Sequence, residues 1–275
     1  MTGKTNWVGI IATIILLGGS ILVLMPLAWM ISTALKAPDE IFTNRSFIPI
    51  AWAWRNFYDA WTSAPFTLYL RNTLIITFLG MIGSLISNCL VAYGFAKLNF
   101  KGREVVFMAV LATMMIPGIV TLIPAFIIFV RIGWVGKFLP LIVPAFFGGA
   151  FNIFLMRQFF KGIPMAYSEA AKVEGANELT VLTRIIVPMS KPIITTIAIF
   201  EFNGRWNDFM GPLLYLRDEH LFTLQIGLRT FRGDFGMIWN QFMAASLLVL
   251  LPSIILFFLF HKYILQSVNI GGIKG

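Results

Sequence analysis

The sequence predicts an all-α polytopic membrane protein, on three observations. Hydrophobic residues make up 58% of its 275 residues and charged residues only 12%, and the mean hydropathy is +0.84, whereas a soluble domain carries about a quarter charged residues. The apolar residues form runs long enough to cross a bilayer, which takes a helix of about 20 residues. None of the runs alternates like a lipid-facing barrel strand, so each must satisfy its backbone internally, as a helix does.

Six runs are predicted to cross the membrane as a single transmembrane domain over residues 1–275. The first lies where a secretory signal would, but it is longer than a signal core and no small-residue cleavage site follows it, so we expect it to be retained. Four prolines are expected to bend the third and fourth spans: Pro117, Pro124, Pro140 and Pro144. The predicted spans are approximately 7–34, 68–96, 104–130, 138–160, 192–216 and 238–263.

The protein is expected in the inner (cytoplasmic) membrane, and its charge favours an orientation with both termini in the cytoplasm. With this topology the inner segments hold eleven Lys and Arg residues and the outer segments nine, while Arg205 lies inside the fifth span. This is a small excess in the direction of the positive-inside rule. The net charge of +9 needs no nucleic-acid partner. Cys89 is the only cysteine, which excludes an intramolecular disulfide.

The polar segment 161–191, between the fourth and fifth spans, is predicted to be a cytoplasmic loop that folds as helix, break and helix. Pro164 suits a first helical turn, residues 169–174 are good helix formers, and Gly175 interrupts them. Alanines would let another protein approach the backbone closely, and Lys172 and Glu178 would add charged contacts. The alternative is a helix that is merely solvated, which leaves an exposed alanine-rich face unexplained.

This loop carries a resemblance to a known family. Glu169-Ala-Ala-Lys-Val-Glu-Gly-Ala, followed by Ile185-Ile-Val-Pro-Met-Ser-Lys-Pro, resembles the EAA loop of membrane subunits in binding-protein-dependent ABC importers. Glu174 stands where Asp is more usual, and Leu182 stands where an aromatic residue is common. The resemblance implies a cytoplasmic coupling helix that contacts an ATPase through Glu169, Ala170, Ala171, Glu174, Gly175 and Ala176.

Further motifs resemble the second, maltose-type permease of sugar importers. In the fifth span, Phe200-Glu-Phe-Asn-Gly-Arg-Trp-Asn-Asp-Phe-Met-Gly-Pro-Leu is similar to their W-N-D-F-x-x-P-L run, and Phe222-Thr-Leu-Gln-Ile-Gly-Leu and the tail Gly271-Gly-Ile-Lys-Gly also match. The resemblance extends from Leu35 to Gly275. It implies a heterodimer with a sister permease, two cytoplasmic ATPase subunits that bind ATP and Mg, and an extracytoplasmic sugar-binding protein.

The fifth span carries polar residues that are predicted to line a substrate path. Charges at membrane depth cost several kcal/mol unless they are paired or face a cavity, and Arg205 lies four residues after Glu201, close enough to pair with it. An aromatic plate beside amides and carboxylates suits a sugar ring. The alternative, that the amides only pack against a sister helix, stays open. The predicted path residues are Glu201, Asn203, Trp206, Asn207 and Asp208.

Four other polar residues within spans are predicted to form hydrogen bonds between helices rather than to contact a ligand: Asn72, Asn88, Tyr93 and Asn152. No phosphate-binding Gly-x-x-x-x-Gly-Lys-Ser/Thr loop occurs in the sequence. The glycine pair Gly148-Gly149 lies in an apolar span and lacks the following Lys. His220 and His261 have no ligand partner at metal-binding spacing, and no Gly-x-Ser-x-Gly elbow is present. The chain by itself is therefore expected to be no enzyme and to hold no metal or cofactor.

The function that follows is the permease subunit of an ATP-driven importer of di- or oligosaccharides. It would form half of the translocation pathway and couple it to a cytoplasmic ATPase. One alternative keeps the ABC architecture but transports glycerol phosphate or another small solute, because such importers share the branch. A second alternative is an ion-driven secondary transporter, whose repeated halves have no clear counterpart here.

Overall fold

The computed structural model describes residues 7–233 and 236–272. Within them the all-α class is confirmed, since the strands β1 (Arg232–Gly233) and β2 (Gly236–Met237) form only a short antiparallel pair. Contacts divide the chain into two compact units, residues 1–66 with 227–251 and residues 67–226 with 252–275. Lys4 and Lys274, which entered the predicted charge excess, lie outside the described residues, as do the last three residues of the tail motif.

The first unit contains the long apolar helix α1 (Trp7–Ala34), the short helices α2 (Glu40–Thr43) and α3 (Arg55–Thr62), η5 (Leu228–Phe231), and the first part of α15 (Trp239–Gly272). The apolar stretch of α1 has no buried part within the chain. A helix that is apolar on every side suits lipid or a protein neighbour. The Asn56 side chain joins α3 to the end of α1 by donating to the carbonyls of Ala34 and Lys36, at 2.9 and 2.8 Å.

The loop that follows α1 is organised around two buried charged side chains. Lys36 is only 1% exposed, and its Nζ donates to the carbonyls of Asn44 and Ser46 at 2.8 and 2.7 Å. The Glu40 carboxylate accepts hydrogen bonds from the Ile50 amide and the Asn44 side chain. These hydrogen bonds, the one from Ile50 foremost, hold the pKa of Glu40 below its usual value although burial acts to raise it. The predicted outer loop is therefore an ordered structure.

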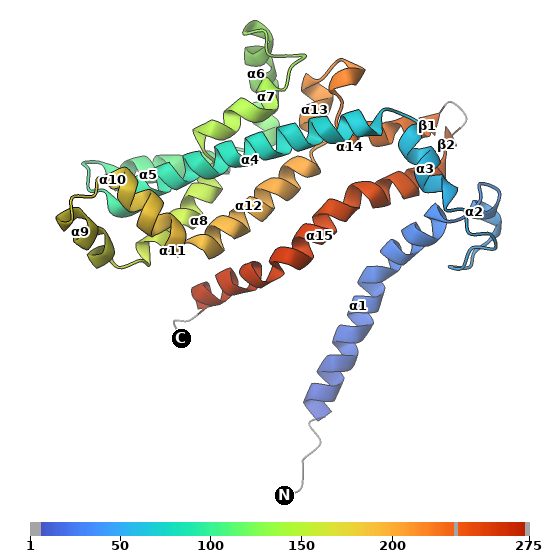
Figure 1. Cartoon of the computed structure of the whole chain (residues 1–275), viewed down its shortest axis with the longest axis horizontal. Helices are drawn as coiled ribbons and strands as arrows, with labels where there is room; N and C mark the ends of the chain where they lie inside the picture. The colour runs from blue at the N-terminus through green and yellow to red at the C-terminus, as the bar shows by residue number, and fades with distance from the viewer. Residues whose placement is uncertain (1–6, 234–235, 273–275) are drawn as a thin grey trace, which may run out of the picture. The chain divides into compact units, whose positions relative to one another are not determined.

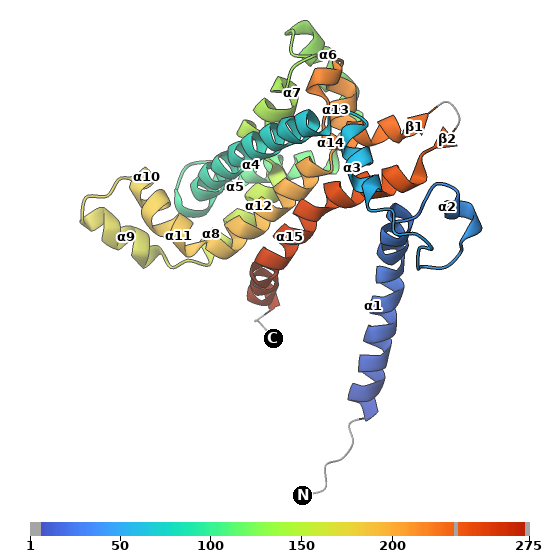
Figure 2. The ribbon, with the colours of Figure 1, turned by 45° about the vertical axis from the view of Figure 1, so that its right-hand side comes forward.

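The second unit is built around α4 (Phe66–Lys97), α8 (Ala150–Lys161) and α12 (Lys191–Trp206), which lie side by side in Figures 1 and 2. Their common core contains Tyr93 from α4, Met156 and Phe160 from α8, and Ile193 and Ile197 from α12. The remaining helices are α5 (Arg103–Ala112), η1 (Thr113–Met115), α6 (Gly118–Arg131), α7 (Leu139–Ile142), η2 (Val143–Phe147), α9 (Met165–Val173), α10 (Glu178–Val181), η3 (Leu182–Ile186), α11 (Val187–Met189), α13 (Met210–Tyr215), η4 (Glu219–Leu221) and α14 (Leu224–Gly227).

Three expected spans are not continuous helices. The fourth is divided into α7, η2 and α8, with Gly148 and Gly149 outside any helix. The third is bent by 96° between residues 103–115 and 118–131, because Ile116 precedes Pro117 and is extended, as a residue before proline prefers. The fifth ends as a helix at Trp206, and α13 begins only at Met210. Within the described residues four helices are long and apolar enough to cross a membrane. Six spans result if each of two bent pairs, 103–115 with 118–131 and 178–189 with 191–206, counts as one.

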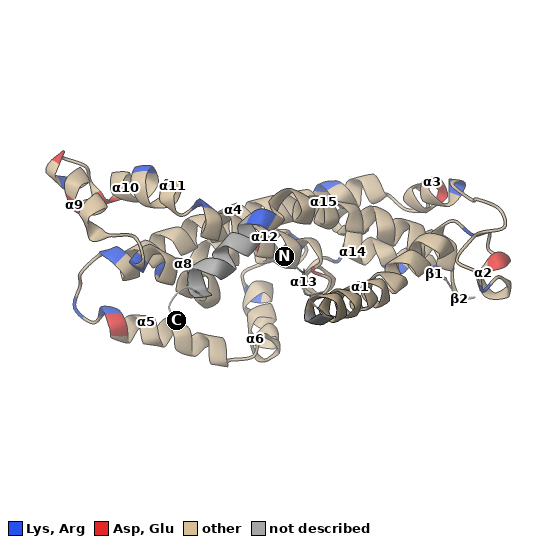
Figure 3. Cartoon of the chain, turned by 90° about the horizontal axis from the view of Figure 1, so that it is seen from below, with Lys and Arg blue, Asp and Glu red and all other residues tan. Residues whose placement is uncertain are grey.

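Charged residues are few in the longest helices, α1, α4 and α15, whereas α12 carries Lys191, Glu201 and Arg205. Figure 3 shows blue and red gathered around α9, the start of α5, and α2 and α3, with tan over most of the long helices. This distribution agrees with helices that lie in lipid and with loops that lie in water, since a charge at the bilayer centre is costly.

Candidate coupling loop and translocation site

The loop between α8 and α12 begins with α9, which follows the extended residue Pro164. Pro164 is therefore the residue before the helix, one position earlier than the first turn predicted for it. Gly175 ends the helix in the left-handed conformation, with φ +88°, and the amide of Ala176 reaches back to the carbonyl of Ala171 at 2.9 Å. Glycine is favoured at such a stop because it has no Cβ to clash. Asn177 then caps α10 by accepting from the Thr180 amide at 2.8 Å.

The six residues predicted to contact an ATPase fall into two groups. Glu169, Ala170, Glu174 and Gly175 are exposed, whereas Ala171 and Ala176 are half-buried and pack against the core of α4, α8 and α12. The small side chains of these two alanines let the loop approach its own bundle, which leaves only part of their surface for the predicted partner. The outward surface of the loop includes these four exposed residues and a further exposed residue that the sequence reasoning missed.

That missed residue is Val173, which is 90% exposed at the end of α9. An isolated exposed apolar residue is common, but Val173 stands directly between Lys172 and Glu174, next to the Gly175 turn. The signal in the sequence is an apolar residue within a charged helix. Val173 adds an apolar contact to the charged surface that the exposed residues present.

A hydrogen-bonded chain connects this loop to α4. The Lys172 ammonium lies 2.6 Å from the Glu178 carboxylate, and the same carboxylate accepts from the Tyr93 hydroxyl at 2.6 Å. Glu178, expected to supply a contact around the alanine face, is therefore used within the chain. At the start of the loop, the Lys97 ammonium at the end of α4 donates to the Ile163 carbonyl.

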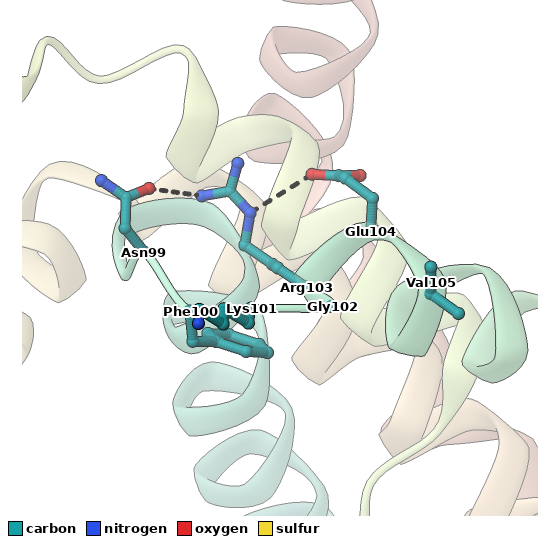
Figure 4. Close-up of a pocket in the computed structure, with 7 residues that line it drawn as sticks. All are labelled: Asn99, Phe100, Lys101, Gly102, Arg103, Glu104 and Val105. Atoms are coloured by element: carbon teal, nitrogen blue, oxygen red, sulfur yellow. Dashed lines mark hydrogen bonds and ion pairs between the residues drawn. The ribbon is translucent and has the colours of Figure 1, made fainter.

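A second set of contacts joins α4, α5 and α8 beside the loop. The Arg157 guanidinium, nearly buried, donates to both Glu104 carboxylate oxygens at 2.6 and 2.7 Å and lies 3.8 Å from the centroid of the Phe107 ring. In the turn between α4 and α5, an open hollow of about 540 Å³ is crossed by Arg103, which donates to Asn99 and pairs with Glu104 (Figure 4). These contacts hold the ends of three helices together.

In α12, the predicted pair of Glu201 and Arg205 is confirmed, with Nε 3.0 Å from the carboxylate. The other carboxylate oxygen accepts from the Asn152 side chain of α8 at 2.7 Å, and the guanidinium also donates to the Leu141 carbonyl at 3.1 Å. Gly80 of α4 makes room for this guanidinium, because a Cβ there would overlap it. The charge pair is thus enclosed by three other segments of the second unit.

The structure corrects the expectation for Trp206. Its side chain is only 1% exposed, and its ring stacks on Phe202 with centroids 5.2 Å apart and planes 15° from parallel. The indole therefore offers no open face to a sugar. The expectation of a sugar-stacking plate is wrong because α12 turns this face towards the protein interior.

The remaining predicted path residues point in different directions. Asn203 is half-buried and donates to the Ile199 carbonyl of its own helix. Asn207 is exposed and accepts from the Gln225 side chain at 3.2 Å. Asp208 accepts from the Gly211 amide at the start of α13. The five predicted residues therefore do not form one cluster.

Of the predicted path residues, Glu201 alone lines a hollow of about 460 Å³ in the second unit. Sequence reasoning missed its other walls, although Phe200 directly precedes Glu201 and the Gly148-Gly149 break precedes α8. We call this hollow the Glu201 pocket. Its lining residues are Thr113, Met114, Gly149, Ala150, Phe151, Asn152, Phe200 and Glu201.

The four polar span residues all form hydrogen bonds to other segments, although the partner of Asn88 is the non-helical Gly149. Each joins its helix to another segment of the second unit. Asn72 donates to the carbonyls of His220 and Phe222, Asn88 accepts from the Gly149 amide, Tyr93 donates to Glu178, and Asn152 donates to Glu201.

Comparisons with known proteins agree with this architecture. Residues 86–270 match the family model described as the binding-protein-dependent transport system inner membrane component. The probable ABC transporter permease protein YurM of Bacillus subtilis is 33% identical over 91% of this chain and 83% of its own length. The trehalose/maltose transport system permease protein MalG of Thermococcus litoralis is 30% identical over 97% of this chain and 98% of its own length.

Among solved structures, a chain of a bacterial ABC transporter involved in the import of the acidic polysaccharide alginate superposes with a TM-score of 0.85. It is 24% identical, and the match covers 96% of this chain and 99% of that one. This likeness shows the fold.

Proposed function

The chain belongs to the family of binding-protein-dependent transport system inner membrane components, and on this premise we propose that it is the permease subunit of an ATP-driven carbohydrate importer. The observation that carries the proposal is the exposed charged surface around Gly175, which lies between α8 and α12 inside the region matched by the family. Named relatives that transport sugars support the substrate class. Membership of this family argues against the alternative of an ion-driven transporter. Glycerol phosphate is kept as an alternative substrate.

The proposal includes the partners. A sister permease would complete the pathway, two ATPase subunits would bind and hydrolyse ATP with Mg, and an extracytoplasmic binding protein would deliver the sugar. The requirement for a binding protein is supported by the family description. This chain would lack ATPase activity of its own and would receive its energy through the loop around α9.

The route of coupling within this chain would run from α9 to α4. A push on α9 moves Lys172, whose partner Glu178 is also hydrogen-bonded to Tyr93. Because these charge-assisted bonds are short and directional, a movement of the loop would pull on the end of α4. The π-helical segment η3, between α10 and α11, is of a type that often occurs at functional sites.

The proposed function is tested by uptake in the host cell. A strain that lacks this chain is complemented with the wild type, and entry of labelled maltotriose, trehalose, arabinotriose and glycerol 3-phosphate is measured with and without vanadate, an inhibitor of ABC ATPases. We expect uptake of a carbohydrate that depends on this chain and is blocked by vanadate. Uptake that persists with vanadate, or that depends on an ion gradient alone, would contradict the proposal.

We also predict that the loop around α9 faces the cytoplasm and that the segment before η4 faces outward. In a Cys89→Ser background, Asn177→Cys should react with a membrane-impermeant maleimide only in opened cells, and Asp218→Cys should react in intact cells. Both positions are exposed in the structure, so each thiol is accessible from its own side. Reversed labelling would overturn a topology with both termini inside.

A further inference from the structure

The Glu201 pocket combines flat apolar surfaces with hydrogen-bonding groups. Phe151, near the start of α8, is 49% exposed, and Phe200 of α12 is 48% exposed, and both line the pocket. Aromatic faces pack against the C–H surface of a sugar ring. Since Trp206 is buried, these two phenylalanines are the aromatic surfaces that accompany Glu201.

The polar groups of the pocket match a hydroxyl group, which both donates and accepts hydrogen bonds. An ionised carboxylate has about four lone-pair sites. Asn152 and Arg205 each donate one hydrogen bond to Glu201, so acceptor capacity remains. Donors are close, because the pocket includes the first residues of the 12-residue helix α8, and the first amides of a helix lack intrahelical acceptors.

The charge of the pocket is unsuited to an anion. Its eight lining residues include one carboxylate and no Lys or Arg. The nearby Arg205 guanidinium is engaged by Glu201 and by the Leu141 carbonyl. An anionic group in the pocket would therefore lie beside a carboxylate and find no cation free to pair with it, and like charges repel.

We propose that the Glu201 pocket binds an uncharged sugar unit of the transported carbohydrate, by stacking on Phe151 and Phe200 and hydrogen bonding to Glu201. This assignment rests on the proposed function and narrows it, because it excludes phosphorylated and carboxylated solutes. It also separates this chain from the structural neighbour associated with import of an acidic polysaccharide.

The test uses the uptake assay with volume-conserving variants. Phe200→Leu and Phe151→Leu keep the apolar bulk but remove the aromatic face. The matched control is Phe147→Leu, because Phe147 is 81% exposed in the same unit and does not line the pocket. Membrane amount and ATP hydrolysis in inverted vesicles are measured for every variant. The probes are maltotriose, trehalose and arabinotriose as neutral sugars, with digalacturonate and glycerol 3-phosphate as anions.

We expect chain-dependent uptake of a neutral probe and of neither anion. Uptake should fall about tenfold in Phe200→Leu and Phe151→Leu, the size of effect that one lost apolar contact produces, with unchanged membrane amount. The Phe147→Leu variant should transport normally. Unchanged uptake in both pocket variants, or uptake of an anion by the wild type, would overturn the assignment but leave the permease function standing. Chain-dependent uptake that persists with vanadate would instead contradict the proposed function itself.

Discussion

The variant Gly175→Asp is expected to abolish transport while leaving the protein in the membrane. Gly175 has φ +88°, and a residue with a Cβ pays roughly 1–2 kcal/mol in this left-handed conformation. A Cβ there meets no neighbouring atom in the chain, so the bundle should stay intact. The new carboxylate, next to Glu174, would disturb the exposed surface that we assign to ATPase docking. Transport should fall by more than about tenfold, which corresponds to a loss of ~1.4 kcal/mol in the free energy of ATPase docking.

The measurement combines sugar uptake with ATP hydrolysis in inverted vesicles, so that uncoupling is seen directly. The matched control is Gly133→Asp, because Gly133 is also left-handed, with φ +68°, and also has open space around it. Gly133→Asp introduces the same strain and charge far from the loop in sequence. The docking assignment fails if Gly175→Asp transports at the wild-type rate, or if both variants lose transport equally.

The variant Arg205→Leu is expected to produce the largest loss of stability. The Glu201 side chain is 17% exposed and that of Arg205 22%, so removing the guanidinium leaves a largely enclosed carboxylate with Asn152 as its remaining side-chain partner. Loss of one member of a buried pair typically costs about 3–5 kcal/mol. We expect a reduced amount of protein in the membrane and a lower midpoint of thermal aggregation in detergent.

Two further variants separate the buried charge from other causes. Glu201→Gln combined with Arg205→Leu removes both charges and should recover much of the lost stability, because the uncompensated carboxylate is gone. Arg55→Leu breaks a pair of the same spacing in which Arg55 is 83% exposed, and such surface pairs contribute only about 0.2–1 kcal/mol. A loss in Arg205→Leu no larger than in Arg55→Leu would show that the pair does not stabilise the second unit.

Comparison of particular residues shows where prediction from sequence succeeded. The pair of Glu201 and Arg205 was predictable because residues four apart share a helix face whatever surrounds them. The Gly175 stop was predictable because few residues other than glycine adopt its backbone conformation readily. The partner of Asn152 was not predictable, since Glu201 lies 49 residues further along the chain and nothing local relates the two.

The differences from expectation have the same physical origin. Trp206 was expected to face a substrate but is buried, and Ala171 and Ala176, expected to face a partner, pack partly against the core. Residue type alone did not decide these cases, because a tryptophan or an alanine suits a binding surface and an interior equally well. The bend at Pro117 was foreseen, whereas its size, 96°, depends on how the two helix segments pack.

The sequence by itself determined the membrane class, the family, the position of the polar loop between α8 and α12 and the charge pair of α12. Each of these follows from local composition, from helical spacing or from a contiguous motif. Only the tertiary structure decided which side of α12 and of α9 is buried, that Phe151 and Phe200 flank Glu201, and that Glu178 is bound to Tyr93. The reason is that helical geometry sets which residues share a face, whereas contacts between segments distant in the chain set what that face meets.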